Sequence, residues 1–132
     1  MNKRISISLL LLFVSFQSIY TRIITTNDLK AALSEANPGD TIELKSGTYR
    51  DVPYSLKNGT YEKKIKIKID PNADVDFVGT SSSCIFDDMY IHDVVFEGEM
   101  YLHRALCGIK LLNSSYINIT GLFIANLEKK EF

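Results

Sequence analysis

The sequence lacks any excess of positive charge: 15 lysines and arginines stand against 16 aspartates and glutamates among its 132 residues. A protein that binds the phosphate backbone of nucleic acids normally carries a clear surplus or patch of basic side chains. We therefore expect no nucleic-acid partner. The length suits a single domain, and a hydrophobic content of 45% is typical of a folded globular chain.

A hydrophobic run long enough to cross a membrane is also missing. The apolar residues 5–16 follow the basic start Lys3-Arg4, and this run is too short for a spanning helix of about 20 residues. A basic start followed by a short apolar run is typical of a secretory signal peptide. We predict that residues 1–20 form a cleaved signal peptide, with an N-terminal signal anchor as the alternative. Cleavage would leave 13 basic against 16 acidic residues in a secreted protein without a membrane segment.

Cysteine is scarce, because Cys84 and Cys107 are the only two in the chain. An even count allows one disulfide in an oxidising compartment, but the sequence does not settle whether the two residues meet. Three Asn-x-Ser/Thr motifs agree with secretion, since such motifs are glycosylation acceptors in secreted proteins. The predicted acceptors are Asn58, Asn113 and Asn118.

Charge is segregated along the chain. A basic block is followed by residues 70–99, which contain several carboxylates and no Lys or Arg. In a fold built from stacked layers, two such blocks can lie on neighbouring layers and neutralise each other. The basic block comprises Lys57, Lys63, Lys64, Lys66 and Lys68.

The pattern of the chain changes at Pro38-Gly39, a pair that ends a preceding helix or strand. Before it, apolar residues recur at i, i+3, i+4 and i+7, which predicts a short amphipathic helix within a capping segment, residues 21–36. The helix stripe consists of Leu29, Ala32, Leu33 and Ala36. A stripe of Leu and Ala suits a cap over the open end of a solenoid.

After Pro38-Gly39 the periodicity becomes two, as in half-buried strands. Residues 41–45 and 64–69 alternate strictly, and turns containing Gly, Pro, Asn or Ser separate the segments. Tyr90-Ile91 and Tyr116-Ile117 recur at a spacing of 26, and the cysteines at 23, which is typical of solenoid repeats. We predict solenoid coils over residues 37–127 and a charged tail over residues 128–132.

The residues from Leu29 to Leu33, then Pro38-Gly39-Asp40-Thr41-Ile42, then Gly47-Thr48-Tyr49 resemble the N-terminal cap and first coil of right-handed parallel β-helix proteins. The resemblance is to the alginate lyase and chondroitinase B family of polysaccharide lyases. It implies an all-β fold, a right-handed parallel β-helix with a short N-terminal capping α-helix. The side chains expected to point inward are Ile42, Leu44, Ile65, Ile67, Ile69, Val75, Phe77, Ile91, Ile117 and Ile119.

The resemblance also implies a chemistry. Lyases of this kind remove the C5 proton of a uronate by β-elimination, and they need a base together with a charge stabiliser. The family's catalytic Lys and Arg and its acidic calcium ligands lie on later coils, so no catalytic residue is carried over. Calcium is implied by the resemblance alone, and no other cofactor is evident.

We therefore expect a truncated or non-catalytic secreted module associated with acidic polysaccharide. The alternative is an active lyase acting on a uronate-containing polysaccharide. A third hypothesis is a structural fragment that self-associates through an uncapped C-terminal coil.

Several residues are candidates for a site. The catalytic candidates are His103, Arg104 and Lys66, and His92 lies one apparent coil before His103. The stripe Lys64, Lys66 and Lys68 is a candidate for binding an acidic glycan. Lysines on an exposed strand also serve solubility and prevent edge pairing, which is the competing interpretation.

Carboxylates and tyrosines supply two further hypotheses. Oxygen ligands such as Asp74, Asp76, Asp87 and Asp88 could hold calcium. Adjacent Asp87 and Asp88 would face opposite sides of a strand, so we expect solvated loop residues and no metal site. Tyr90 and Tyr116 could form a sugar-binding pair, although aromatics at coil spacing also occur in cores and surface stacks.

Overall fold

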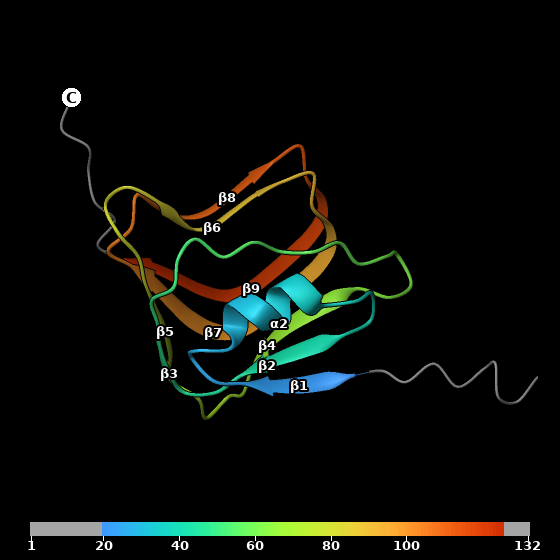
Figure 1. The fold of residues 1–132 in the computed structure, drawn as a ribbon, viewed down its shortest axis with the longest axis horizontal. Helices are drawn as coiled ribbons and strands as arrows, with labels where there is room; N and C mark the ends of the chain where they lie inside the picture. The colour runs from blue at the N-terminus through green and yellow to red at the C-terminus, as the bar shows by residue number, and fades with distance from the viewer. Residues whose placement is uncertain (1–19, 126–132) are drawn as a thin grey trace, which may run out of the picture.

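A computed structural model describes residues 20–125, which form a right-handed parallel β-helix with one short helix (Figure 1). The predicted signal peptide, apart from Tyr20, and the predicted charged tail lie outside the described residues. Among residues 20–125, no helix has the length and apolarity needed to cross a membrane. The elements are β1 (Thr21–Ile24), α2 (Leu29–Glu35), β2 (Thr41–Leu44), β3 (Gly47–Tyr49), β4 (Ile65–Ile69), β5 (Val75–Val78), β6 (Cys84–Met89), β7 (His92–His103), β8 (Cys107–Leu112) and β9 (Ser115–Ala125).

The strands form three faces around one core, and the strands within each face are parallel (Figure 1). Face 1 contains β1, β2, β4 and the first halves of β7 and β9. Face 2 contains β3, β5 and the second halves of β7 and β9. Face 3 contains β6 and β8, and Tyr54 extends it by a single bridge to Phe86.

Glycines allow two strands to turn from face 1 to face 2 without a loop. Gly98 in β7 and Gly121 in β9 have φ of 110° and 77°, positive values that residues with a side chain rarely adopt. A Cβ on Gly98 would lie 2.6 Å from the carbonyl oxygen of Ile69, and a Cβ on Gly121 would lie 2.5 Å from that of Gly98. Both bends therefore require glycine, because φ is positive and because a Cβ would clash with a carbonyl oxygen of the neighbouring coil.

The inward side chains confirm the predicted strand orientation. Eight of the ten predicted residues are buried, and Ile117 and Ile119 are partly buried against the core. These two belong to β9, the last described strand of face 1, so they have core contacts on one side only. Each fully buried apolar side chain contributes about 1.5 to 3 kcal/mol to folding.

Aromatic rings fill much of the core. Their centroids lie 5.1 to 5.7 Å from those of their neighbours in mostly tilted and edge contacts. The hydroxyl of Tyr49 donates to a backbone carbonyl, with Lys45 O at 2.8 Å and Ile24 O at 3.2 Å, and burial raises the pKa of this phenol to about 12. The sequence predicted only Phe77 among the inward rings, which are Tyr49, Tyr54, Phe77, Phe86 and Phe96.

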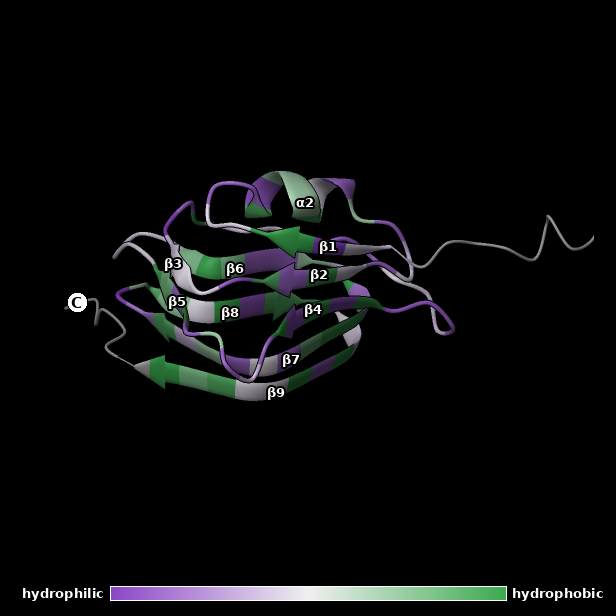
Figure 2. Cartoon of the chain, turned by 90° about the horizontal axis from the view of Figure 1, so that it is seen from below, coloured by the Kyte–Doolittle hydropathy of each residue, from purple (hydrophilic) through white to green (hydrophobic). Residues whose placement is uncertain are grey.

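The helix caps one end of the stack, as predicted. Figure 2 shows α2 lying over the β1 end of the coils, and the four residues of its predicted apolar stripe are buried. Asp28 occupies the N-cap position without a side-chain cap, because its carboxylate accepts a hydrogen bond from the Thr25 hydroxyl at 2.6 Å. The capping segment also contributes β1, which pairs in parallel with β2.

The structure corrects the predicted repeat register. Tyr90 precedes β7 and Tyr116 lies within β9, so they occupy different positions of the coil. Cys84 pairs with Cys107 across neighbouring strands, at a sequence separation of 23. The pairs His92–Ser115 and Val94–Ile117 have this same offset, which is shorter than the step from Tyr90 to Tyr116. The cysteine spacing therefore gives the true period of these two coils.

We predict that Leu33→Asp destabilises the protein by about 3 to 5 kcal/mol, because an unpaired carboxylate would enter the apolar end of the core. Leu33 is only 2% exposed. Ala31→Asp, at an exposed position of the same helix, is the matched control and should unfold close to the unchanged protein. Thermal or urea unfolding measures both. An unchanged midpoint for Leu33→Asp would contradict the capping role.

Candidate functional site

The lysine stripe lies on the outside of face 1, where two of its three lysines have acidic side chains on neighbouring coils. The Nζ atom of Lys66 is 3.0 Å from a carboxylate oxygen of Glu97. Lys68 stands in register between Glu43 and Glu97. An exposed ion pair of this kind contributes about 0 to 1 kcal/mol. The stripe is therefore a mixed surface of both charges, as the segregation of charge in the sequence predicted.

A histidine and an aspartate meet on the outside of face 2. Nε2 of His103, at the end of β7, lies 2.5 Å from Oδ1 of Asp76 in β5. Both side chains are partly buried, so the carboxylate orients the imidazole ring. Arg104 follows at once, exposed, with φ of 53°. The sequence pointed to His103 and Arg104, but it suggested Asp76 only as a calcium ligand and not as the partner of His103.

Two exposed aromatic rings lie beside this pair. Tyr101 and Phe123 are stacked with their centroids 5.1 Å apart and an angle of 19° between the ring planes. They are 45% and 47% exposed, and Tyr101 is in register with Asp76. One face of each ring is covered by the other ring, and by strand register Asp76 is the neighbour of Tyr101 on its other side. Sequence reasoning missed this stack, although the two rings recur at close to the coil period.

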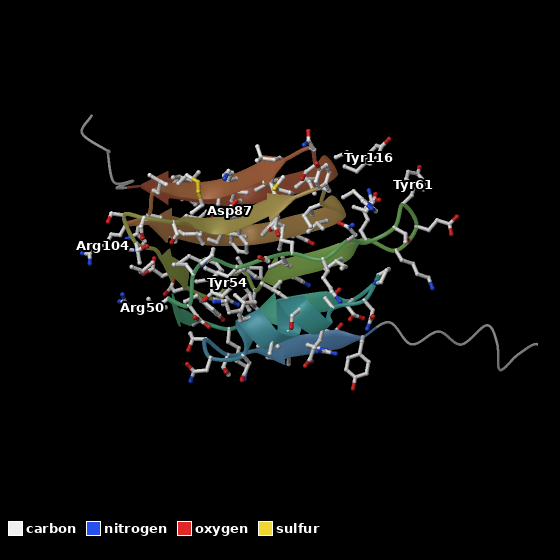
Figure 3. All side chains as sticks on the ribbon, turned by 45° about the horizontal axis from the view of Figure 1, so that its top comes forward. Arg50, Tyr54, Tyr61, Asp87, Arg104 and Tyr116 are labelled. Carbon is white, nitrogen blue, oxygen red and sulfur yellow. A yellow bond between two sulfur atoms is a disulfide. The ribbon has the colours of Figure 1, made fainter. Side chains whose placement is uncertain are left out.

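Basic residues border the same surface. Arg50 directly follows β3, and by strand register it lies two strands from His103, a distance of about 10 Å. Figure 3 shows Arg50 and Arg104 projecting from the same edge of the molecule. We call this surface the lateral site, and it consists of Arg50, Asp76, Tyr101, His103, Arg104 and Phe123.

Two of the predicted candidates lie elsewhere. Lys66 is on face 1 with Glu97, so the three proposed catalytic residues do not form one constellation. His92 begins β7, whereas His103 ends it, and Nδ1 of His92 lies 2.8 Å from Oδ2 of Asp93.

The carboxylates considered for calcium are not solvated loop residues as a group, which corrects that prediction. Asp87 and Asp88 lie in β6 on opposite sides of the strand, and Asp87 forms a 3.5 Å ion pair with Lys110. Asp88 is buried and accepts the backbone N–H of Leu56 at 3.0 and 3.1 Å. Of the four, only Asp74 is an exposed loop residue.

Burial raises the pKa of the Asp88 carboxyl, the N–H of Leu56 lowers it, and the charge of Asp87 raises it. Within residues 20–125, no group of three or more His, Cys, Asp or Glu side chains could hold a metal ion.

A disulfide joins Cys84 of β6 to Cys107 of β8, so it connects two successive coils on face 3. The sequence left this pairing open. The three predicted glycosylation acceptors are exposed. One of them, Asn58, also accepts the backbone N–H of His92 at 3.0 Å through its side-chain oxygen.

Comparison with known proteins gives a consistent result. A family model described as Chondroitinase B matches residues 23–129. Among solved structures, the fold resembles an alginate lyase from Paenibacillus sp. str. FPU-7, with a TM-score of 0.74 and 23% identity. The likeness covers 83% of this chain and 38% of the alginate lyase chain, so this chain spans well under half of that enzyme. A search of curated protein sequences found no match.

We predict that Asp88→Asn changes the pH dependence of stability. A carboxyl whose pKa is raised by folding contributes most stability below its unfolded pKa and loses that contribution as the pH rises. Asn cannot ionise but still accepts the Leu56 N–H. Asp88→Asn should therefore be more stable relative to the unchanged protein, with a relatively larger free energy of unfolding, at about pH 7 than at about pH 3.

Urea unfolding at both pH values tests this prediction. Asp74→Asn, which removes an exposed carboxylate, serves as the control. An equal difference at the two pH values would show that Asp88 carries no desolvation penalty.

Proposed function

Because the chain belongs to the chondroitinase B family, we propose that it is a secreted β-helix protein that binds acidic polysaccharide through the lateral site, without catalysing its cleavage. The observation that carries this proposal is the aromatic stack Tyr101–Phe123 beside the His103–Asp76 pair. Aromatic rings pack against the apolar faces of sugar rings, while hydroxyl groups need acceptors and carboxylates need cationic donors.

The lateral site supplies each of these groups. The half-exposed rings of Tyr101 and Phe123 offer apolar contact, and Asp76 offers carboxylate oxygens to sugar hydroxyls. The guanidinium groups of Arg50 and Arg104 suit the planar carboxylate of a uronate, because guanidinium donates two parallel hydrogen bonds. The site is therefore suited to an acidic sugar, which agrees with the substrates of polysaccharide lyases.

Secretion is part of the same proposal. Its support is the predicted signal peptide, residues 1–20, together with the disulfide between Cys84 and Cys107. A disulfide between two β-strands persists in oxidising compartments and is reduced in most cytosols.

A second candidate function is polysaccharide lyase activity, and one observation favours it. His103 is oriented by Asp76 and is followed by Arg104, so a base and a cation are adjacent. In β-elimination the base takes the C5 proton of the uronate, electrons form the double bond to C4, and the O4 substituent leaves. The separation of Lys66 from this pair supports the non-catalytic proposal.

We predict that Tyr101→Ser and Phe123→Ser each weaken binding to alginate or another uronate polymer about fivefold, since a stacking contact contributes about 1 kcal/mol. Affinity electrophoresis or calorimetry measures the effect. Ile23→Ser is the matched control, because Ile23 is an exposed apolar residue on the outside of face 1. Unchanged affinity in both aromatic variants would contradict the lateral site.

We also predict no lyase activity. The protein is incubated with alginate, pectate and chondroitin sulfate, with and without calcium, and unsaturated ends are followed by absorbance. A positioned base contributes about 10² to 10⁴ in rate, so turnover by a complete site would be clear. Saturable product formation that His103→Gln abolishes would overturn the non-catalytic proposal and establish the second candidate.

A further inference from the structure

A second surface rich in exposed side chains lies where the chain turns from face 3 into face 1. Three successive coils contribute to it through residues 57–64, 90–93 and 113–116. The segments are hydrogen-bonded in sequence: the N–H of Gly59 donates to His92 O at 3.1 Å, and the N–H of Ser115 donates to Ile91 O at 3.0 Å. Figure 3 shows Tyr61 and Tyr116 projecting from this end of the molecule. We call the surface around Tyr61, Tyr90 and Tyr116 the corner site.

The backbone of this turn repeats from one coil to the next. Tyr90 and Asp93 have φ of 60° and 56°, and their counterparts Asn113 and Tyr116 have φ of 51° and 53°. These residues correspond because Met89 pairs with Leu112 just before the turn, and His92 pairs with Ser115 within it. The turns of these two coils therefore contain two left-handed positions each, at the same places.

Tyrosine is a poor choice for these positions. Asn tolerates left-handed backbone, as Asn113 illustrates, whereas a bulky side chain is strained there. Burial does not compensate, because Tyr90 and Tyr116 are 64% and 72% exposed. Within residues 20–125, neither ring stacks on another aromatic ring. The fold gains little from these two rings, and strained residues of this kind cluster at functional sites.

Positive charge is concentrated in one of the three segments of the corner site. Residues 57–64 contain Lys57, Lys63 and Lys64 against the single carboxylate of Glu62. The ammonium group of Lys64 lies 5.9 Å from the centre of the Tyr61 ring. An aromatic ring beside an ammonium group suits a ligand with an apolar face and a negative charge.

A buried carboxylate lies in the same turn. Asp93 is 6% exposed, and its Oδ2 orients the half-exposed His92 ring, leaving the other ring nitrogen for a ligand. The second oxygen, Oδ1, has no hydrogen-bond partner among the described residues. A buried polar atom without a partner is unusual in a part of the protein that serves only the fold.

We propose that the corner site is a second binding site, separate from the lateral site, for an acidic pyranose unit that stacks on Tyr90 and Tyr116. This inference rests on the proposed function in one respect, the binding of acidic polysaccharide, and does not depend on the lateral site. The lysines of residues 57–64 pair with the carboxylate or sulfate of the sugar, and His92 contacts its hydroxyl groups. The lateral site is at the end of β7 and the corner site at its beginning, so the two sites bind different units of polysaccharide.

The test replaces both tyrosines by the residue that the backbone prefers. Tyr90→Asn with Tyr116→Asn relieves the strain, so the melting temperature should be unchanged or higher by about 4 to 8 °C per position. Calorimetry with an alginate tetrasaccharide should show affinity reduced at least tenfold. Tyr90→Phe with Tyr116→Phe keeps the rings and should keep most of the affinity. Ile23→Asn is the control on face 1.

The same titration with Tyr101→Ser separates this inference from the proposed function. Affinity lost in Tyr101→Ser but intact in the Asn variant overturns the corner site and leaves the lateral site. The reverse result supports the corner site and overturns the lateral site. Maltotetraose, a neutral tetrasaccharide, tests the preference for acidic sugars. If the Asn variant loses affinity for maltotetraose by the same factor as for the alginate tetrasaccharide, the acidic preference is overturned. If the unchanged protein sediments as a dimer and the double Asn variant as a monomer, the tyrosines form an interface between copies, and the proposal is overturned.

Discussion

The structure depends on one constraint, the in-register stacking of successive coils. Ile42 pairs with Ile67, Ile67 with Phe96, and Phe96 with Ile119, so one column of apolar side chains runs through face 1. Each coil supplies the backbone hydrogen bonds and the apolar contacts of the next, and no coil could bury its inner face alone. The capping helix follows from the same constraint, because the first coil would otherwise expose the core.

Stacking also determines what the outer surface can do. Each coil places one side chain above another at a spacing of about 4.8 Å, so a property repeated at the coil period becomes a column. On face 1 the column Glu43, Lys68, Glu97 alternates in charge. On face 2 the column Asp76, Tyr101, Phe123 combines a carboxylate with two rings. Two surfaces of different chemistry therefore arise on adjacent faces of one core.

Face 3 is the least extensive of the three, and polar and covalent links reinforce it. Its two strands are joined by the disulfide between Cys84 and Cys107. The carboxylate of Asp88 holds the backbone of Leu56, so an extended segment of the first coil is attached where no full strand forms. The loss of a disulfide in a small domain costs about 2 to 5 kcal/mol, so these links matter for a face with few ladder hydrogen bonds.

Local patterns in the sequence determined the helix and the strands whose apolar and polar residues alternate strictly. Leu29 to Ala36 has helical spacing, and residues 64–69 alternate, so the cap, the inward isoleucines and the class of fold could be predicted. Both signals are carried by neighbours in the chain. The strand Cys84–Met89 was missed, because its apolar and acidic residues are not in strict alternation.

Contacts between coils were decided only by tertiary structure. In the column of face 1, the step along the chain from Ile67 to Phe96 is longer than the step before it, and the step from Phe96 to Ile119 is the shortest. Turns of different length absorb the difference, and the bend at Gly98 shifts the register within β7. No single spacing could therefore place Asp76 beside His103 or Tyr101 on Phe123. The sequence contained the residues of the lateral site, but the lengths of the turns determined which of them meet.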